Sequence, residues 1–175
     1  MKTLLTEQQL RDGVARMAAE INEHYRDRRL TIVGVMTGSI VLVADLIRLL
    51  NMPLRVGVVQ ARSYRGDATS PGELTINSDL LPDIHDHHVL VVDDIFDTGK
   101  TLFRLLDQMR VLRPTTLRSA VLLRKAGRQC VAMEPDHVAF EIPDAFVVGY
   151  GLDYRDEYRN LPYLAALEDQ DLAAR

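Results

Sequence analysis

The sequence of 175 residues lacks tryptophan and contains one cysteine, Cys130. A single cysteine excludes a disulfide within the chain and fits a reducing compartment such as the cytosol, where we expect Cys130 to be a buried or half-buried neutral thiol. No apolar run approaches the ~18 residues of a membrane-spanning helix. Residues 1–7 contain no long apolar stretch typical of a signal peptide. We therefore expect a cytoplasmic protein without membrane contacts.

A surplus of positive charge is also missing. Lysine and arginine total 21 residues and aspartate and glutamate 25, so the formal net charge is −4. General nucleic-acid binders usually carry a basic surplus, so we expect no nucleic-acid partner. Hydrophobic residues are 47% and charged residues 26%, as in ordinary globular proteins. The length suits a single domain covering residues 1–175.

Segments with strand and helix patterns alternate along the chain. Helices are expected from Thr6, whose spacing to Gln9 is that of a capping box, from Gly38 to about Leu50, and over 99–112. Strands are expected at 30–36, 54–60, 89–93, 117–123 and 138–140, and the segment 89–93 is nearly continuous in its apolar character. Strands without a polar face are buried on both sides, which predicts an α/β fold: a twisted, mostly parallel sheet with helices on both faces.

The most informative segment is 91–102, which reads VVDDIFDTGKTL. A buried strand delivers Asp93 and Asp94 at its carboxyl end, and Asp97 follows three residues later. In open α/β sheets, ligands bind at the carboxyl ends of strands. The helix that begins near Gly99 presents free N–H groups and a positive dipole end, which suit a phosphate. The aspartates could hold ribose hydroxyls or a hydrated Mg²⁺.

Two other interpretations of this segment are open. The run Gly99-Lys100-Thr101 matches the end of a P-loop, but a P-loop also needs a glycine five residues before Gly99, where this chain has Asp94. A carboxylate there would oppose bound phosphates, which disfavours a P-loop nucleoside triphosphatase. Alternatively, the acids are helix caps and solvated turn residues, as most carboxylates are. The convergence of three aspartates and a glycine turn at one sheet edge favours a ligand site.

This segment resembles the phosphoribosyl pyrophosphate (PRPP) motif of type I phosphoribosyltransferases, and specifically their hypoxanthine-guanine branch. The resemblance implies that Asp93 and Asp94 hold the ribose, directly or through Mg²⁺, and that Asp97 is the general base. It also implies the residues that bind the 5-phosphate and ribose of PRPP: Asp93, Asp94, Asp97, Thr98, Gly99, Lys100 and Thr101.

Two further segments are similar to family motifs for pyrophosphate. Residues 35–39 resemble the pyrophosphate loop, with Thr37 and Gly38 as its binding residues and a non-proline cis peptide bond expected between Met36 and Thr37. The family often has a basic residue where this chain has Thr37. Ser63 and Tyr64 resemble the serine-tyrosine pair of the family's flexible lid, expected at about 62–82. Long loops of this kind are usually functional or mobile.

The resemblance also supplies a purine site. Lys125 matches the lysine that donates to the O6 atom of the purine. The string 142–154 (IPDAFVVGYGLDY) resembles the hood over the base, which the N-terminal region and about 141–170 would form. Phe146 would stack on the base and Val147 would bind its edge through the backbone. Asp153 would help Asp93 and Asp94 hold Mg²⁺ and would lie near the purine, and Arg159 would contact pyrophosphate.

The resemblance implies a purine salvage enzyme that uses PRPP and Mg²⁺. It would convert hypoxanthine or guanine to IMP or GMP with release of pyrophosphate, and would be a homodimer or homotetramer. Two alternatives stay open at this point. One is a phosphoribosyltransferase that prefers xanthine or a pyrimidine. The other is a regulatory protein that uses the same fold to sense nucleotides.

Overall fold

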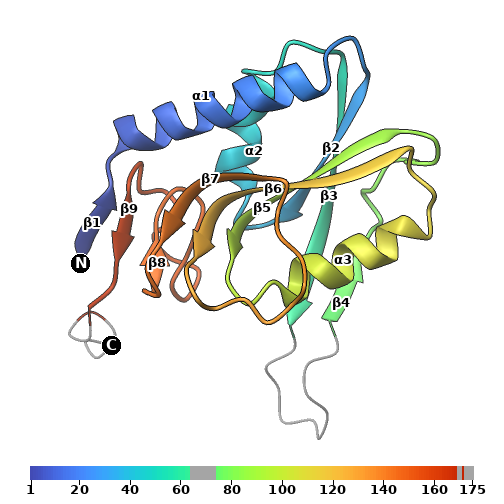
Figure 1. Cartoon of the computed structure of the whole chain (residues 1–175). Helices are drawn as coiled ribbons and strands as arrows, with labels where there is room; N and C mark the ends of the chain where they lie inside the picture. Colours follow the sequence, from blue (N-terminus) through green and yellow to red (C-terminus); the bar gives the residue numbers. More distant parts are fainter. Residues whose placement is uncertain (64–73, 169–170, 172–175) are drawn as a thin grey trace, which may run out of the picture.

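The computed structural model describes residues 1–63, 74–168 and 171. Figure 1 shows a large sheet with helices on two sides and a smaller sheet near the chain termini. The elements in chain order are β1 (Lys2–Leu5), α1 (Glu7–His24), β2 (Leu30–Met36), α2 (Ile40–Ile47), β3 (Leu54–Ser63), β4 (Leu74–Asn77), β5 (His88–Phe96), α3 (Lys100–Arg110), β6 (Thr116–Lys125), β7 (His137–Ile142), β8 (Val147–Val148) and β9 (Leu164–Ala166).

The large sheet has the strand order β4-β3-β2-β5-β6-β7. Neighbours from β3 to β7 pair in parallel, and β4 is antiparallel at one edge. From β2 the chain moves outward to β3, whereas from β5 it moves the other way to β6. The strand order therefore reverses between β2 and β5, and a ligand crevice is expected outside the carboxyl ends of these two strands.

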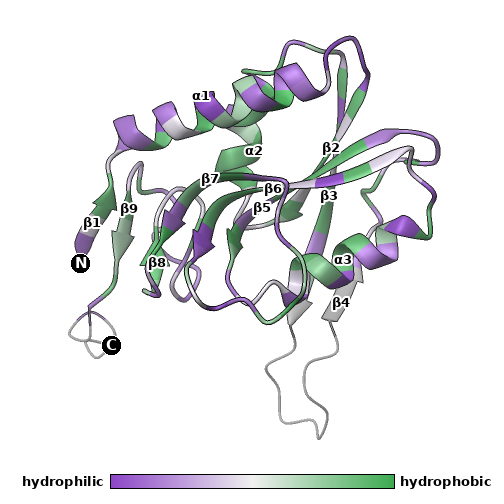
Figure 2. Cartoon of the chain, in the orientation of Figure 1, coloured by the Kyte–Doolittle hydropathy of each residue, from purple (hydrophilic) through white to green (hydrophobic). Residues whose placement is uncertain are grey.

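The two faces of the sheet have separate apolar cores. Leu90 and Val92 of β5 pack with α1 and α2, whereas the intervening Val89 and Val91 pack with α3. This alternation follows from the period of two along a strand. Figure 2 shows hydrophobic residues along the central strands and along α2, whereas α1 and α3 carry both polar and hydrophobic residues. The predicted α/β fold, with a mostly parallel sheet covered on both faces, is confirmed.

The small sheet forms the hood expected from the N- and C-terminal segments. Its order is β1-β9-β8, with β1 and β8 each antiparallel to β9. The sequence did not indicate β1, β8 or β9, because strands of two to four residues show no measurable period. Gly151, in the loop after β8, lies against the loop after β2, since a Cβ there would fall 2.1 Å from the carbonyl oxygen of Gly38. The hood thereby reaches the crevice.

Several predicted boundaries were wrong. The loop expected over 61–83 contains β4, which pairs with the end of β3 in an antiparallel hairpin. Residues 64–73, most of the expected lid, lie outside the described residues. Strand β5 continues three residues beyond Asp93, to Phe96, because it stays paired with β6. Helix α2 ends at Ile47 rather than near Leu50. Among the described residues, no helix is long and apolar enough to cross a membrane.

The expected start of α1 is confirmed by a complete capping box. Thr6 Oγ1 accepts from the N–H of Gln9 at 3.3 Å, and the N–H of Thr6 donates to Gln9 Oε1 at 2.8 Å. We expect Thr6→Ala to lower the free energy of unfolding by about 1 kcal/mol, because the helix loses this cap. Urea denaturation measures the loss. An unchanged midpoint with an unchanged slope would contradict it.

Candidate active site

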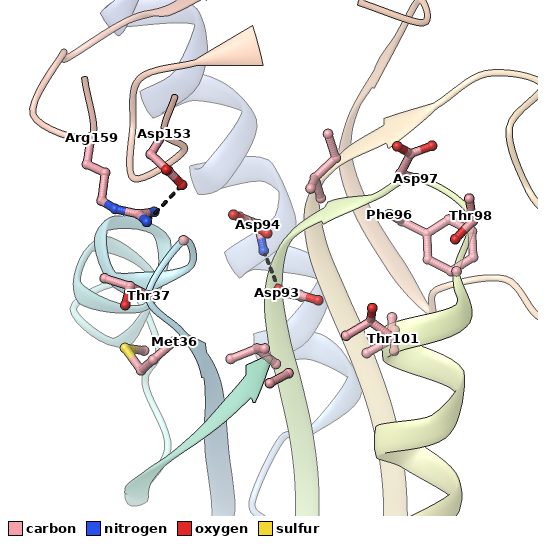
Figure 3. A pocket seen from close by; sticks show the side chains of 16 residues that line it. Met36, Thr37, Asp93, Asp94, Phe96, Asp97, Thr98, Thr101, Asp153 and Arg159 are labelled. Atoms are coloured by element: carbon pink, nitrogen blue, oxygen red, sulfur yellow. Dashed lines mark hydrogen bonds and ion pairs between the residues drawn. The ribbon is translucent and has the colours of Figure 1, made fainter. Parts of the chain in front are cut away.

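A cavity of about 330 Å³ lies at the carboxyl ends of β2 and β5, where the strand order reverses. Figure 3 shows the turn from β5 into α3 on one side, the loop after β2 and Arg159 on the other, and two aspartates between them. The predicted site residues that line it are Thr37, Gly38, Asp93, Asp94, Asp97, Thr98, Gly99, Thr101, Asp153 and Arg159. Residues from three separate segments of the sequence (37–38, 93–101 and 153–159) thus meet in one cavity.

The turn between β5 and α3 is built around Gly99. Its φ of +80° is in the left-handed region, and a Cβ would lie 2.6 Å from both Phe96 and Val131. This compact turn brings Thr98 and Thr101 to the cavity wall. The first N–H groups of α3 lack partners within the helix and suit a bound phosphate. Lys100 is exposed and does not line the cavity.

Asp93 and Asp94 lie in the middle of the cavity, within strand β5 rather than after it. Asp93 is buried, and its Oδ1 accepts a hydrogen bond of 3.0 Å from the N–H of Asp94. Burial raises the pKa of both carboxyls, and the neighbouring Asp94 raises that of Asp93 further. Positive charge brought between them would favour their ionised forms, so this corner is suited to receive a cation.

The opposite wall combines the loop after β2 with the hood. The Met36–Thr37 peptide bond is cis, as the resemblance implies. A Cβ on Gly38 would fall 1.6 Å from Asp94 Oδ2, so only glycine lets this loop approach β5. Arg159 bonds Asp153 at 2.8 Å and donates to the carbonyl oxygen of Gly151 at 2.8 Å. Its guanidinium is thus fixed at the cavity edge (Figure 3).

A second cavity of about 220 Å³ shares Asp94, Asp97 and Asp153 with the first. Three other residues that line it, Lys125, Phe146 and Val147, are ones that the sequence predicted to bind the purine. The Phe146 ring is 47% exposed and contacts Tyr154 edge-on, with ring centres 5.5 Å apart. An exposed aromatic face at a cavity mouth is suited to stack on a planar ligand. The structure thus brings the predicted purine residues together beside the first cavity.

Four charged side chains of alternating sign meet at the edge of this second cavity. Arg128 Nε donates to Asp97 Oδ1 at 3.0 Å, and Lys125 Nζ lies 3.5 Å from Asp97 Oδ2. Asp144 lies 3.4 Å from Lys125 Nζ and 3.6 Å from an Arg128 nitrogen. Sequence reasoning assigned Arg128 and Asp144 no role, because no pattern within β6 or the hood indicates that they meet Asp97.

The structure does not describe the side chains of two of the predicted site residues, and it corrects the expectation for the single cysteine. Tyr64 and the side chain of Ser63 lie outside the described residues, so their predicted role stays a prediction. Cys130 is exposed, and the expectation of a buried or half-buried thiol was wrong. It follows the turn after β6, where its N–H donates to the carbonyl oxygen of Thr98 at 2.9 Å. This hydrogen bond links the turn at 126–130 to the turn between β5 and α3.

The carboxylates of the first cavity are the candidate ligands for a magnesium ion. Asp93, Asp94 and Asp153 line the same cavity, but the described residues contain no group of three or more acidic, histidine or cysteine side chains close enough to hold a metal. The three do not form a preformed cage. Mg²⁺ usually binds through one or two carboxylates together with substrate phosphates and water. An oxygen-only donor set in the cavity predicted to bind phosphate fits that mode.

The chain is similar to known phosphoribosyltransferases along most of its length. Residues 1–155 match the family model of the phosphoribosyl transferase domain. A hypoxanthine-guanine phosphoribosyltransferase of Staphylococcus epidermidis is 40% identical, over 94% of this chain and 92% of that protein. A hypoxanthine phosphoribosyltransferase of Haemophilus influenzae is 37% identical, over 92% of each.

Solved structures agree with the sequence comparison. The Trypanosoma cruzi hypoxanthine phosphoribosyltransferase matches with a TM-score of 0.92 at 36% identity, over 100% of this chain and 95% of that one. A Bacillus anthracis hypoxanthine-guanine phosphoribosyltransferase matches with a TM-score of 0.90 at 34% identity, over 96% and 99%. Fold, site and relatives together define a phosphoribosyltransferase, and within that family the chain belongs to the hypoxanthine-guanine phosphoribosyltransferases.

Proposed function

We propose that this protein transfers the 5-phosphoribosyl group from PRPP to hypoxanthine or guanine, giving IMP or GMP and pyrophosphate. The observation that carries the proposal is the pair of adjoining cavities that share Asp94, Asp97 and Asp153. One is suited to a sugar phosphate and the other to a planar base. The new bond forms where the two meet. The relatives support this reaction, and the reducing compartment favoured by the single cysteine supports a cytoplasmic location.

PRPP occupies the larger cavity in this proposal. The 5-phosphate accepts hydrogen bonds from the turn at 97–101, including the hydroxyls of Thr98 and Thr101. Asp93 and Asp94 hold the ribose hydroxyls. The pyrophosphate group lies towards Thr37, Gly38 and Arg159, on the opposite wall. Arg159 suits this role because a guanidinium binds phosphate oxygens in a fixed planar geometry. Ser63 and Tyr64 are proposed to add contacts from the lid.

The purine occupies the smaller cavity. Phe146 stacks on the base, Val147 binds its edge through the backbone, and Asp153 lies beside it. Lys125 donates to O6, which favours hypoxanthine and guanine. Adenine has an amino group at that position and would leave the half-buried lysine facing another donor. A site built around a hydrogen bond rejects a ligand that cannot make it by a large factor.

Magnesium is the proposed cofactor, held by Asp93, Asp94 and Asp153 together with substrate oxygens. When bound, it neutralises negative charge on the pyrophosphate leaving group. The protein's own contribution to the chemistry is proton removal. The bond between C1 of the ribose and the pyrophosphate oxygen breaks, and the pyrophosphate keeps the electron pair. N9 of the purine then bonds to C1, and Asp97 accepts the proton from N7 as general base.

We expect Lys125→Ala to lower kcat/KM for hypoxanthine by about 10- to 100-fold. A hydrogen bond to a charged group contributes about 1.5–3 kcal/mol, and each 1.36 kcal/mol is a tenfold change in rate. The activity ratio of hypoxanthine to adenine should fall by the same factor. Initial rates with both bases measure the effect, with the exposed Lys2→Ala as the control. Equal base selectivity in Lys125→Ala and the unmodified enzyme would contradict the assignment.

The proposed function is tested with a panel of bases. Hypoxanthine, guanine, xanthine, adenine and uracil are each incubated with the protein, PRPP and Mg²⁺, and nucleotide formation is followed by absorbance. We expect turnover with hypoxanthine or guanine, none without PRPP, and loss of activity with a chelator. Preference for xanthine or uracil would overturn the choice of substrate. Tight RNA binding with no turnover of any base would indicate a regulator.

The enzyme is also proposed to assemble as a homodimer or homotetramer, as the family resemblance implies. A study of the T. cruzi relative concerns the role of its C-terminal region in oligomeric state and activity. Light scattering on the purified protein measures the assembled mass. A particle of 19.8 kDa, the mass of one chain, would contradict the proposal.

A further inference from the structure

Four charged side chains form a cluster beside the purine cavity: Asp97, Lys125, Arg128 and Asp144. Of the two cations in this cluster, Arg128 has no role in the proposed reaction. Lys125 faces the purine cavity, whereas Arg128 lines neither the purine cavity nor the sugar-phosphate cavity. Its contacts are instead with the two carboxylates, and the shortest is the 3.0 Å hydrogen bond to Oδ1 of Asp97. This bond is made by Nε, whose direction is fixed by the planar guanidinium.

This ion pair contributes little to the stability of the fold. The side chains of Arg128 and Asp144 are 46% and 51% exposed, and that of Asp97 is 36% exposed. Pairs with such exposure are worth only about 0–1 kcal/mol, because water and salt screen them. We therefore expect Arg128 to affect the orientation of the Asp97 carboxylate rather than the stability of the fold.

The two oxygens of Asp97 have different neighbours. Oδ1 accepts the hydrogen bond from Arg128, whereas Oδ2 lies 3.5 Å from Lys125 Nζ. A purine that placed its O6 near Lys125 would bring N7 to the same side of the carboxylate, since O6 and N7 share one edge of the ring. Oδ2, on the Lys125 side, is thus the oxygen that would lie nearer to N7, and the hydrogen bond from Arg128 to Oδ1 restrains rotation of the carboxylate.

The backbone around Arg128 is also hydrogen-bonded to the turn between β5 and α3. The N–H of Cys130 donates to the carbonyl oxygen of Thr98 at 2.9 Å. Cys130 is two residues after Arg128 in the chain, and Thr98 directly follows Asp97. The turn at 126–130 contains Gly127, whose φ is +72°. Arg128 and Asp97 are thus linked through both backbone and side chain.

We propose that Arg128 is a positioning residue for the reaction: it holds Asp97 through Oδ1 so that Oδ2 faces N7 of the bound purine. This rests on the proposed function, in which Asp97 accepts the N7 proton. Misplacement of a reacting group by about 1 Å can cost around 100-fold in rate. The cost should fall on kcat, because Arg128 does not contact the bound substrates.

The test compares Arg128→Gln with Arg128→Lys and Arg124→Gln. Arg124 is a matched control, because it also bonds two carboxylates, Glu134 and Glu141, but neither lines a cavity of the site. We expect Arg128→Gln to lower kcat by about 10- to 100-fold with the KM for both substrates within about twofold. Arg128→Lys should recover part of kcat, because it keeps the charge. Arg124→Gln should match the unmodified enzyme, and melting temperatures should be similar throughout.

A second measurement separates positioning from a general structural effect. In the Asp97→Asn background, Arg128→Gln should lower kcat no further, because residues that act as one unit have non-additive effects. An equal loss in both backgrounds, or an unchanged kcat in Arg128→Gln alone, would overturn the proposal while the unmodified enzyme still converts hypoxanthine. If the unmodified protein shows no turnover with any base, the proposed function itself fails, and the role of Arg128 fails with it.

Discussion

Asp97→Asn is expected to lower kcat by about 10²- to 10⁴-fold, the usual contribution of a positioned proton acceptor. The amide keeps the size of the side chain but cannot accept the N7 proton. PRPP binding should survive, because the turn backbone and the hydroxyls of Thr98 and Thr101 remain. The KM for PRPP should therefore stay within about threefold of the original value. Steady-state kinetics with hypoxanthine and saturating Mg²⁺ measure both constants.

The matched control is Asp107→Asn, which changes an exposed aspartate on α3 whose carboxylate lies 3.8 Å from Arg110 and lines neither cavity of the site. It should leave kcat unchanged. An unchanged kcat in Asp97→Asn would remove Asp97 from the role of general base. A rise in the KM for PRPP with kcat preserved would instead place Asp97 in ground-state binding.

Gly38→Ala is the second change with a large expected effect. The added Cβ would lie 1.6 Å from Oδ2 and 2.5 Å from Cγ of Asp94, a short side chain whose carboxyl group would have to move. Either Asp94 or the pyrophosphate loop would shift, and a displacement of about 1 Å can cost around 100-fold in rate. We expect kcat/KM for PRPP to fall by about that factor or more, as measured by initial rates at varied PRPP.

Gly13→Ala provides the comparison for this prediction. Its Cβ would also overlap a side chain, at 2.0 Å from Phe140 Cζ, but Gly13 lies on α1 and lines neither cavity of the site. It should lower the melting temperature and leave kcat/KM per folded molecule near the original value. Similar kinetics for Gly38→Ala and the unmodified enzyme would show that the loop tolerates the methyl group. The geometric argument would then be wrong.

Much of the sugar-phosphate site could be predicted because its residues are adjacent in sequence. Strand β5, the glycine turn and α3 are continuous, so a buried apolar run followed by Asp93, Asp94 and Asp97 already indicates a ligand at a strand end. The convergence of Thr37, Asp153 and Arg159 on the same cavity came only from the family resemblance. Nothing in their own segments shows that these residues meet.

The hood and the charged cluster show where sequence reasoning fails. Strands β1, β8 and β9 are two to four residues long and are stable only because they pair with one another, so local patterns do not reveal them. Arg124 and Arg128 look alike as flanks of Lys125. Only the register of β6 and the turn after it decide that Arg128 meets Asp97 while Arg124 pairs with Glu134 and Glu141.

The central claim is that a sugar phosphate binds at the turn from β5 to α3 with its base in the adjoining cavity. A crystal structure of the protein with IMP tests this claim most directly. We predict the phosphate on residues 97–101, the ribose beside Asp93 and Asp94, and the purine against Phe146 with O6 near Lys125. IMP bound elsewhere, with this turn free of ligand, would contradict the account.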